Sequence, residues 1–202
     1  MINRPFFFDR VRLQLFDGSL RQGQVDGLTG ILDEWEKSHA SKDDRWLAYM
    51  LATTHHETDR TVKPIKEYGG VAYYTRMYDP EPHGTRPALA RRMGNTAPGD
   101  GAKYCGRGFV QLTWKNNYAA MTPVTGVDLV NDPDRAMELP VATKVLFHGM
   151  MSGMFTGKKL GDYFNKTTED WRNARRIING VDKANAIAEY SKRYYSAISH
   201  TT

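Results

Sequence analysis

Residues 44–70, DRWLAYMLATTHHETDRTVKPIKEYGG, hold the strongest structural signals in the sequence. The stretch begins with Asp44, a residue type that caps helices well. Apolar or small side chains then recur at helical spacing, at Trp46, Leu47, Met50, Leu51 and Thr54. This pattern predicts a helix that carries His55, His56 and Glu57 at its C-terminal end.

The chain after this helix separates two carboxylates, Glu57 and Glu67. Pro64 prevents the helix from continuing to Glu67 and turns the chain, so both carboxylates can face one cleft. Glycoside hydrolysis requires such a pair, one group protonated to donate to the leaving oxygen and one ionised to activate water or attack carbon. Two glutamates in a charged segment can equally be solvated, and their spacing leaves both interpretations open.

A second segment with polar chemistry is GRGFVQLTWKNNY, residues 106–118. Its two glycines allow a close approach of the backbone to a neighbour. Gln111, Thr113 and Asn117 supply neutral hydrogen-bonding groups that suit sugar hydroxyls or amides. We predict a short strand over residues 109–113, with Gln111 and Thr113 on one face. The alternative is a half-buried strand with a merely polar outer face.

The composition is that of an ordinary globular protein. The 202 residues include 28 Lys plus Arg and 23 Asp plus Glu, a net charge of +5, with 40% hydrophobic residues. We expect one domain over residues 1–202. The single Cys105 excludes an intramolecular disulfide and fits a reducing cytosol.

Charge and hydropathy narrow the possible partners. The longest apolar stretch, residues 145–155, falls short of the roughly 20 residues that a bilayer requires, so we expect no stable membrane insertion. Residues 86–115 are locally basic, which fits an anionic partner or a solvated basic face. No nucleic-acid-binding module is recognisable, and we expect no nucleic acid among the partners.

The remaining elements are predicted from periodicity and from cap residues. Residues 19–22 have capping-box spacing ahead of a helix through residue 35, and further helices are expected at about 87–93, 141–155, 169–178 and 183–198. Strands are predicted at 71–78 and 109–113. The chain is therefore mainly α, with at most a small β-sheet.

Several segments together resemble a known family. HHETD, KEYGG, MGNTAPGDGAKYCGRGFVQLTWKNNY and ARRIINGVDKANAIAEYSKRYY are similar, in order and content, to the glycoside hydrolase family 19 chitinases. The likeness is greatest to the related bacteriophage endolysins, and it covers about residues 19–198. It implies a mainly α, lysozyme-like (α+β) fold with two helical lobes flanking a substrate cleft.

The same resemblance implies roles for individual residues. Glu57 matches the general acid, and Glu67 matches the general base. Thr113 matches the residue that helps to hold the attacking water. Gln111 and Asn117 fall on substrate-contacting positions.

Further contacts are expected around these positions. Asn179 matches another position in the family's cleft. The run EYGGVAYY departs from the E-N-L-x-Y type found in many endolysins, and this weakens the assignment of the base. His56 could orient the acid or simply cap the helix. Four aromatic side chains could each stack on a sugar face or belong to the core or rim: Tyr118, Trp114, Tyr73 and Tyr74.

The leading hypothesis is an inverting glycosidase that hydrolyses β-1,4 bonds of peptidoglycan glycan strands. It needs no cofactor and no metal, and we expect a monomer. Residues 1–202 would form a single catalytic domain without a separate wall-binding domain. As an endolysin it would be made in the host cytoplasm without a signal peptide and reach the wall after release by a separate holin.

Three alternatives remain. One is a bacterial chitinase, and another is a wall-binding module without turnover. The third is a zinc-dependent amidase or peptidase that uses His55, His56 and Glu57 with His83 or His148. The H-x-x-x-H spacing that places two imidazoles on one helix face is absent from this segment.

Overall fold

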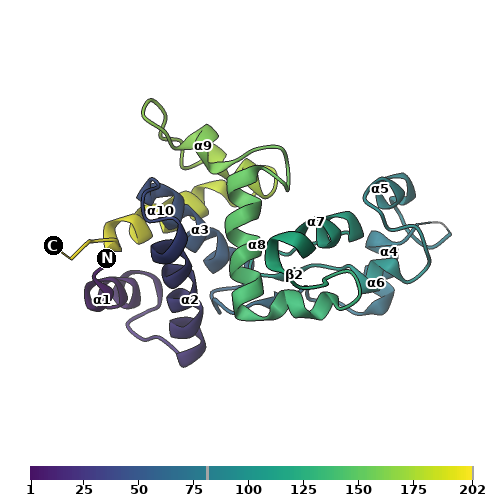
Figure 1. Cartoon of the computed structure of the whole chain (residues 1–202), viewed down its shortest axis with the longest axis horizontal. Helices are drawn as coiled ribbons and strands as arrows, with labels where there is room; N and C mark the ends of the chain where they lie inside the picture. Colours follow the sequence, from purple (N-terminus) through teal and green to yellow (C-terminus); the bar gives the residue numbers. More distant parts are fainter. Residues whose placement is uncertain (81, 202) are drawn as a thin grey trace. The chain divides into compact units, whose positions relative to one another are not determined.

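The computed structural model describes residues 1–80 and 82–201. Within this part of the chain it contains ten α-helices, two short 3₁₀ helices and one two-stranded antiparallel sheet (Figure 1). The prediction of a mainly helical chain with a small sheet is confirmed. None of the helices that the model describes is both long and apolar enough to cross a membrane.

The chain forms two compact units. Unit 1 comprises residues 1–63 together with the chain from residue 146 onward, and unit 2 comprises residues 64–145. The helices of unit 1 are α1 (Arg4–Leu15), α2 (Gln22–Ser38), α3 (Asp44–Glu57), α9 (Leu160–Tyr163), the 3₁₀ helix η2 (Asn173–Ile177) and α10 (Ala184–Ala197). Helix α8 (Leu139–Ser152) contributes residues to both units.

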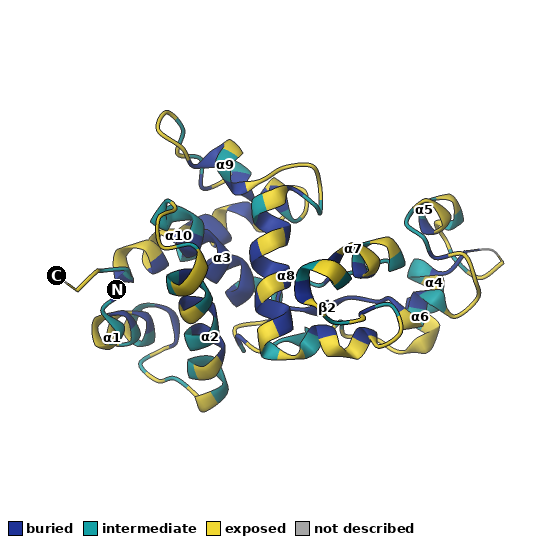
Figure 2. Cartoon of the chain, viewed as in Figure 1, coloured by how far each residue is buried: buried dark blue, intermediate teal, exposed yellow. Residues whose placement is uncertain are grey.

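Helix α3 is the most deeply buried helix segment of unit 1. Nine consecutive residues, from Leu47 to His55, are buried, so the middle of the helix has no solvent-facing side (Figure 2). A helix enclosed in this way is part of a core rather than of a surface. It packs against α10, and His55 lies close to Tyr194 of that helix. The core therefore fixes the position of the last turn of α3.

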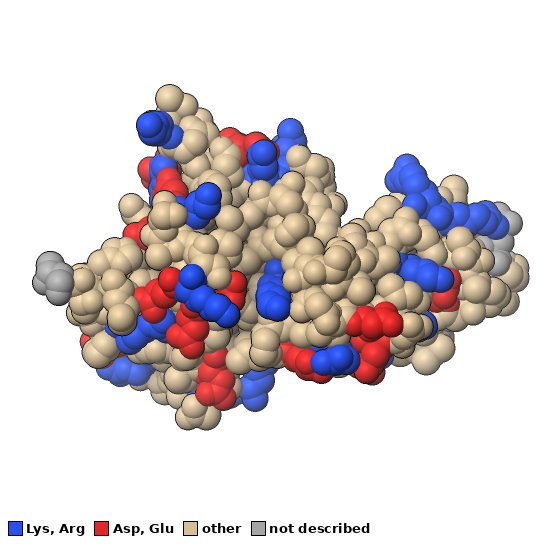
Figure 3. All heavy atoms as spheres, in the orientation of Figure 1, with Lys and Arg blue, Asp and Glu red and all other residues tan. Residues whose placement is uncertain are grey.

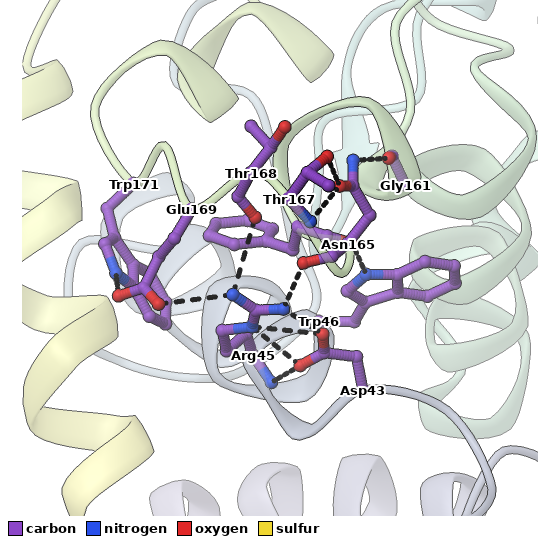
Figure 4. A network of polar contacts seen from close by, with 10 residues as sticks. Asp43, Arg45, Trp46, Gly161, Asn165, Thr167, Thr168, Glu169 and Trp171 are labelled. Atoms are coloured by element: carbon purple, nitrogen blue, oxygen red, sulfur yellow. Dashed lines mark hydrogen bonds and ion pairs between the residues drawn. The ribbon is translucent and has the colours of Figure 1, made fainter.

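The first turn of α3 is held by a polar network (Figure 4). The carboxylate of Asp43, one residue before the predicted cap, accepts a hydrogen bond from the backbone N–H of Arg45. The Arg45 guanidinium also contacts Asp43, the carbonyl of Asn165 at 2.8 Å and the carboxylate of Glu169 at 3.2 Å. The hydrogen bond from the Arg45 side chain lowers the pKa of Asp43. Both ends of α3 are thus fixed within unit 1.

Unit 2 contains the sheet. Its elements are β1 (Ile65–Lys66), α4 (Val71–Tyr78), α5 (Pro87–Arg92), α6 (Asp100–Lys103), β2 (Arg107–Gly108), α7 (Lys115–Thr125) and the 3₁₀ helix η1 (Pro133–Met137). In the sheet, Ile65 pairs with Gly108 and Lys66 with Arg107. The largest buried side chains of this unit are those of Tyr104, Phe109 and Tyr118.

The strand predicted at residues 71–78 is wrong, because this segment forms helix α4. Its β-branched and aromatic residues favour strands as isolated residues, but their packing in the folded chain decides the outcome. The Tyr74 side chain is buried, and its hydroxyl donates to the carbonyls of Glu67 and Gly69. Helical geometry is what aims this tyrosine back at the preceding loop.

The strand predicted at residues 109–113 is also wrong. Strand β2 ends at Gly108, and Arg107 and Leu112 exchange two backbone hydrogen bonds across a tight loop. Gly108 and Gln111 both have positive φ angles, 85° and 54°, so an extended alternation is impossible there. Gln111 and Thr113 therefore do not share a strand face.

Two smaller differences concern helix ends. Ser19 does not cap α2, because that helix begins at Gln22, and the Gln24 side chain accepts from the backbone N–H of Arg21. The helix expected at residues 169–178 is reduced to η2. The helices expected near 87–93, 141–155 and 183–198 are confirmed as α5, α8 and α10.

Helix α2 packs closely against the chain at Val62, and Gly27 is the residue at this contact. A Cβ atom at Gly27 would lie 1.9 Å from the carbonyl oxygen of Val62, a backbone atom that cannot move alone. We expect Gly27→Ala to lower the free energy of unfolding by about 1–3 kcal/mol through overpacking. Gly161→Ala is the matched control, because its Cβ would meet the Trp46 ring at an ordinary 3.4 Å. Equal chemical-denaturation midpoints for the two variants would contradict the prediction.

Candidate active site

The residues predicted to form the site fall into two sets, one in each unit. His56, Glu57 and Asn179 belong to unit 1, whereas Glu67 belongs to unit 2 together with the residues predicted around Thr113. Each set has its own supporting contacts.

Glu57 is the last residue of α3, and its side chain is 17% exposed. Its Oε1 atom lies 2.5 Å from Nη1 of Arg175, a residue of η2 whose side chain is only 4% exposed. Arg175 also donates through Nε to the carbonyl of Asp182 at 3.1 Å. A largely buried cation thus meets the carboxylate predicted to be the acid.

Arg175 did not emerge from the sequence as a site residue. It lies four residues before Asn179, in the segment ARRIING. The sequence feature that could have pointed to it is the pair Arg175 and Arg176 ahead of two isoleucines. The sequence does not tell which arginine is buried, and in the structure it is Arg175. The backbone N–H of Asn179 donates to the carbonyl of Arg175 at 3.1 Å. The structure therefore links the Asn179 segment to Glu57 through Arg175, and the Asn179 side chain is exposed.

The two histidines before Glu57 have different surroundings. His56 is half-buried, and burial lowers its pKa, with Glu57 opposing that effect and Arg175 adding to it. His55 is buried, and its Nδ1 atom lies 3.1 Å from the Tyr194 hydroxyl. Burial, with smaller contributions from Arg60 and His56, lowers the pKa of His55 to about 4. His55 is thus a neutral core residue, and His56 is the histidine with partial access to solvent.

Glu67 directly follows β1 and is held by backbone and side-chain contacts. Its N–H donates to the carbonyl of Gly106 at 2.8 Å, and the N–H of Gly106 donates to its Oε2 atom at 3.2 Å. Its Oε1 atom accepts from the hydroxyls of Tyr78 at 2.7 Å and Tyr73 at 3.3 Å. Neutral donors therefore fix both oxygens of this carboxylate.

Gly106 permits a close approach of Gln111 and Glu67. A Cβ atom at Gly106 would lie 2.7 Å from Gln111 Oε1 and 3.3 Å from Glu67 Cβ. The Gln111 amide donates to the carbonyls of Ile65 and Gly108, both at 3.3 Å. Gln111 therefore braces the sheet beside Glu67, and its side chain stays partly exposed.

Thr113 and Asn117 continue this polar surface. The Thr113 hydroxyl donates to the carbonyl of Gln111 at 2.8 Å, so its oxygen retains lone pairs that can accept a hydrogen bond. The Asn117 amide donates to the carbonyl of Thr113 at 2.8 Å and holds the start of α7 against this turn. Both side chains are half-buried, as residues that contact both protein and ligand would be.

The sugar contact predicted for Tyr118 needs correction. The Tyr118 side chain is completely buried, its hydroxyl donates to the carbonyl of Cys105 at 2.7 Å, and it accepts from Arg107 at 3.0 Å. No part of this ring is available to a ligand, because it forms the core beneath the Gly106 turn. Tyr74 is likewise occupied by backbone contacts, whereas Trp114 is half-buried and packs edge-on against Tyr78.

The basic side chains of residues 86–115 differ in their exposure to solvent. Arg86, Arg91 and Arg92 are exposed, and basic side chains gather at α5 (Figure 3). Arg107, by contrast, is buried and pairs with Asp134 at 2.7 Å. Among the described residues, no three His, Cys, Asp or Glu side chains are arranged to hold a metal ion.

Comparison with known proteins shows which family this chain belongs to. A family model described as "Chitinase class I", of glycoside hydrolase family 19, matches residues 36–154. A family 19 domain-containing protein of Haemophilus influenzae is 34% identical over 119 aligned residues, and the match covers 50% of this chain and 59% of that protein. The chain belongs to glycoside hydrolase family 19. It spans about three fifths of the length of this curated relative.

Two solved structures show that the fold is shared. Chitinase C from Streptomyces griseus matches with a TM-score of 0.60 and 22% identity, over 92% of this chain and 72% of that chain. A bacterial family 19 chitinase matches with a TM-score of 0.54 and 23% identity, over 85% of this chain and 84% of that chain. The predicted fold class is thereby confirmed.

We expect the ion pair between Glu57 and Arg175 to contribute to stability. Arg175→Gln leaves a largely buried carboxylate without its cation, and we expect the free energy of unfolding to fall by about 3 kcal/mol. Arg176→Gln removes the same charge from an exposed neighbour and is expected to change it by less than about 0.5 kcal/mol. Urea denaturation at pH 7 measures both values. The prediction fails if the two variants are equally stable.

We expect the buried His55 to make the free energy of unfolding depend on pH. Its folded pKa of about 4 lies below the ordinary value of 6.5, so protonation favours the unfolded chain as the pH falls below 6.5. The contribution of His55 to the free energy of unfolding is therefore greatest above pH 6.5 and falls progressively towards pH 4. We expect a loss of about 2 kcal/mol between pH 7.5 and pH 5 from this group.

His55→Gln is the variant that isolates this contribution, because glutamine does not titrate. His39 and His56, whose pKa values burial also lowers, add a residual slope of the same sign. The free energy of unfolding of His55→Gln should therefore depend less on pH than that of the unchanged protein. An identical slope for both proteins would show that His55 does not titrate differently on unfolding.

Proposed function

We propose that this chain hydrolyses β-1,4 glycosidic bonds of peptidoglycan glycan strands by an inverting mechanism with two carboxylates. Its membership of glycoside hydrolase family 19 supports glycoside hydrolysis in general. The observation that carries the proposal is the environment of Glu67, a carboxylate fixed by neutral donors beside the polar turn of Gln111 and Thr113. Such a group is suited to take a proton from water.

Glu57 is the proposed general acid. Inverting hydrolysis requires one carboxyl group to protonate the departing oxygen as the glycosidic bond breaks. Arg175 holds Oε1 of Glu57, and the proton to be donated belongs on Oε2. His56 is half-buried next to Glu57 and is in a position to orient it.

Glu67 is the proposed general base, and Thr113 helps to hold the attacking water. The Thr113 hydroxyl proton is engaged with the carbonyl of Gln111, so Thr113 can meet the water only as an acceptor. A water that donates one hydrogen to Thr113 and the other to Glu67 has its oxygen lone pairs free for the anomeric carbon. Gln111, Asn117 and Asn179 are the proposed substrate contacts.

The choice of peptidoglycan rests on the likeness of HHETD, KEYGG and the residues around Gly106 to phage endolysins. Chitin hydrolysis is the second candidate, because the two solved structures described above are chitinases with a similar fold. The two polymers share a β-1,4-linked N-acetylglucosamine unit, and peptidoglycan adds a lactyl ether with its peptide. We also propose that the protein reaches the wall after release by a separate holin.

The decisive experiment compares purified sacculi with chitin oligomers as substrates. We expect muropeptide release from sacculi that exceeds chitin cleavage, with loss of both on Glu57→Gln, because an amide has no proton to donate. Mass spectrometry identifies the cleaved bond, and proton NMR should show the α anomer first. Arg176→Gln, which changes an exposed charge on η2, serves as the folded control.

Three outcomes would contradict parts of this proposal. Cleavage of chitin alone would establish the second candidate instead. A folded Glu57→Gln variant with full activity would exclude Glu57 as the acid. Loss of activity in EDTA that zinc restores would support a metal-dependent wall hydrolase.

A further inference from the structure

The two oxygens of the Glu67 carboxylate have unequal surroundings. Oε1 accepts two hydroxyl hydrogen bonds, from Tyr78 at 2.7 Å and from Tyr73 at 3.3 Å. Oε2 accepts one backbone N–H, from Gly106 at 3.2 Å. Each carboxylate oxygen has about two lone-pair directions. Oε1 is therefore saturated by protein donors, whereas Oε2 keeps one direction free.

Tyr78 is the stronger of the two phenol donors. It is the last residue of α4, is half-buried, and packs edge-on against Trp114 with ring centroids 5.0 Å apart. Burial and the hydrogen bond to Glu67 raise the pKa of the Tyr78 phenol. The phenol thus remains a proton donor throughout the neutral pH range, and the Trp114 ring limits its movement.

Helix α4 also fixes the main chain of Glu67. Tyr74 donates its hydroxyl to the carbonyls of Glu67 and Gly69, while Tyr73 and Tyr78 contact the carboxylate. Three tyrosines of one short helix therefore determine where Glu67 lies and how its carboxylate is rotated. The protein thus places two hydroxyl donors on Oε1 and one backbone N–H on Oε2.

We propose that Tyr78 is a positioning residue for the general base, and that it holds Oε1 of Glu67 so that Oε2 is the oxygen that receives the proton. The inference rests on the proposed function. In the reaction, one O–H bond of water breaks as its proton moves to Oε2, and the water oxygen bonds to the anomeric carbon. The glycosidic C–O bond breaks as the departing oxygen takes the proton of Glu57.

Tyr78→Phe tests this role, because it removes the hydroxyl and keeps the ring against Trp114. We expect kcat to fall by about tenfold to a hundredfold, with KM changed by less than about threefold. A merely structural hydroxyl would lower the melting temperature without this selective loss of kcat.

Tyr104→Phe is the matched control. It removes a buried hydroxyl of the same unit, which donates to the carbonyl of Val130 at 3.1 Å and has no contact with Glu67. We expect a lower melting temperature for this variant, with unchanged kcat and KM. Tyr73→Phe removes the longer hydrogen bond to Oε1 and should lower kcat by a smaller factor than Tyr78→Phe.

The results separate this inference from the proposed function. Inactive Glu67→Gln together with fully active Tyr78→Phe would retain Glu67 as the base and overturn the role of Tyr78. Active Glu67→Gln would overturn the base itself. If Tyr78→Phe does not fold, Tyr73→Phe decides, because an unchanged kcat in that variant would contradict control of Glu67 through Oε1.

Discussion

The enclosure of α3 within unit 1 is the constraint on which the candidate acid depends. A helix whose residues from Leu47 to His55 are all buried has no freedom to rotate or slide. Of its buried polar residues, His55 lies within hydrogen-bond distance of Tyr194, whereas the hydroxyls of Tyr49 and Thr54 have no hydrogen-bond partner among the described residues. Glu57 is the first residue beyond this buried stretch that combines partial exposure with a charge partner, and its direction is set by the core beneath it.

The two carboxylates are held by different chemistry. Glu57 meets a guanidinium that is itself almost fully buried, whereas Glu67 meets two phenols and a backbone N–H. Each set of partners lies in the same unit as its carboxylate, so neither group depends on the other unit for its own orientation.

Helical periodicity was sufficient to predict most of the fold, and it failed where long-range contacts override local preference. The spacing from Trp46 to Thr54 predicted α3 correctly, because a buried helix repeats apolar residues at that spacing. Residues 71–78 have strand-like composition, yet the contacts of Tyr74 and Tyr78 with Glu67 favour a helix. Such contacts join residues whose proximity no local pattern reveals.

In the candidate site too, the sequence does not reveal contacts between residues that are far apart in the chain. Positions with distinctive chemistry, such as Glu57 and Glu67, could be named from the sequence, but partners such as Arg175 and Tyr78 could not. Tyr118 was misassigned because an aromatic ring beside polar residues suits a ligand and a core equally well, and only its burial decides. Gly106 explains why the turn is built this way. A Cβ atom there would push the Gln111 amide aside and crowd Glu67, so a glycine suits the close packing of both side chains against this turn.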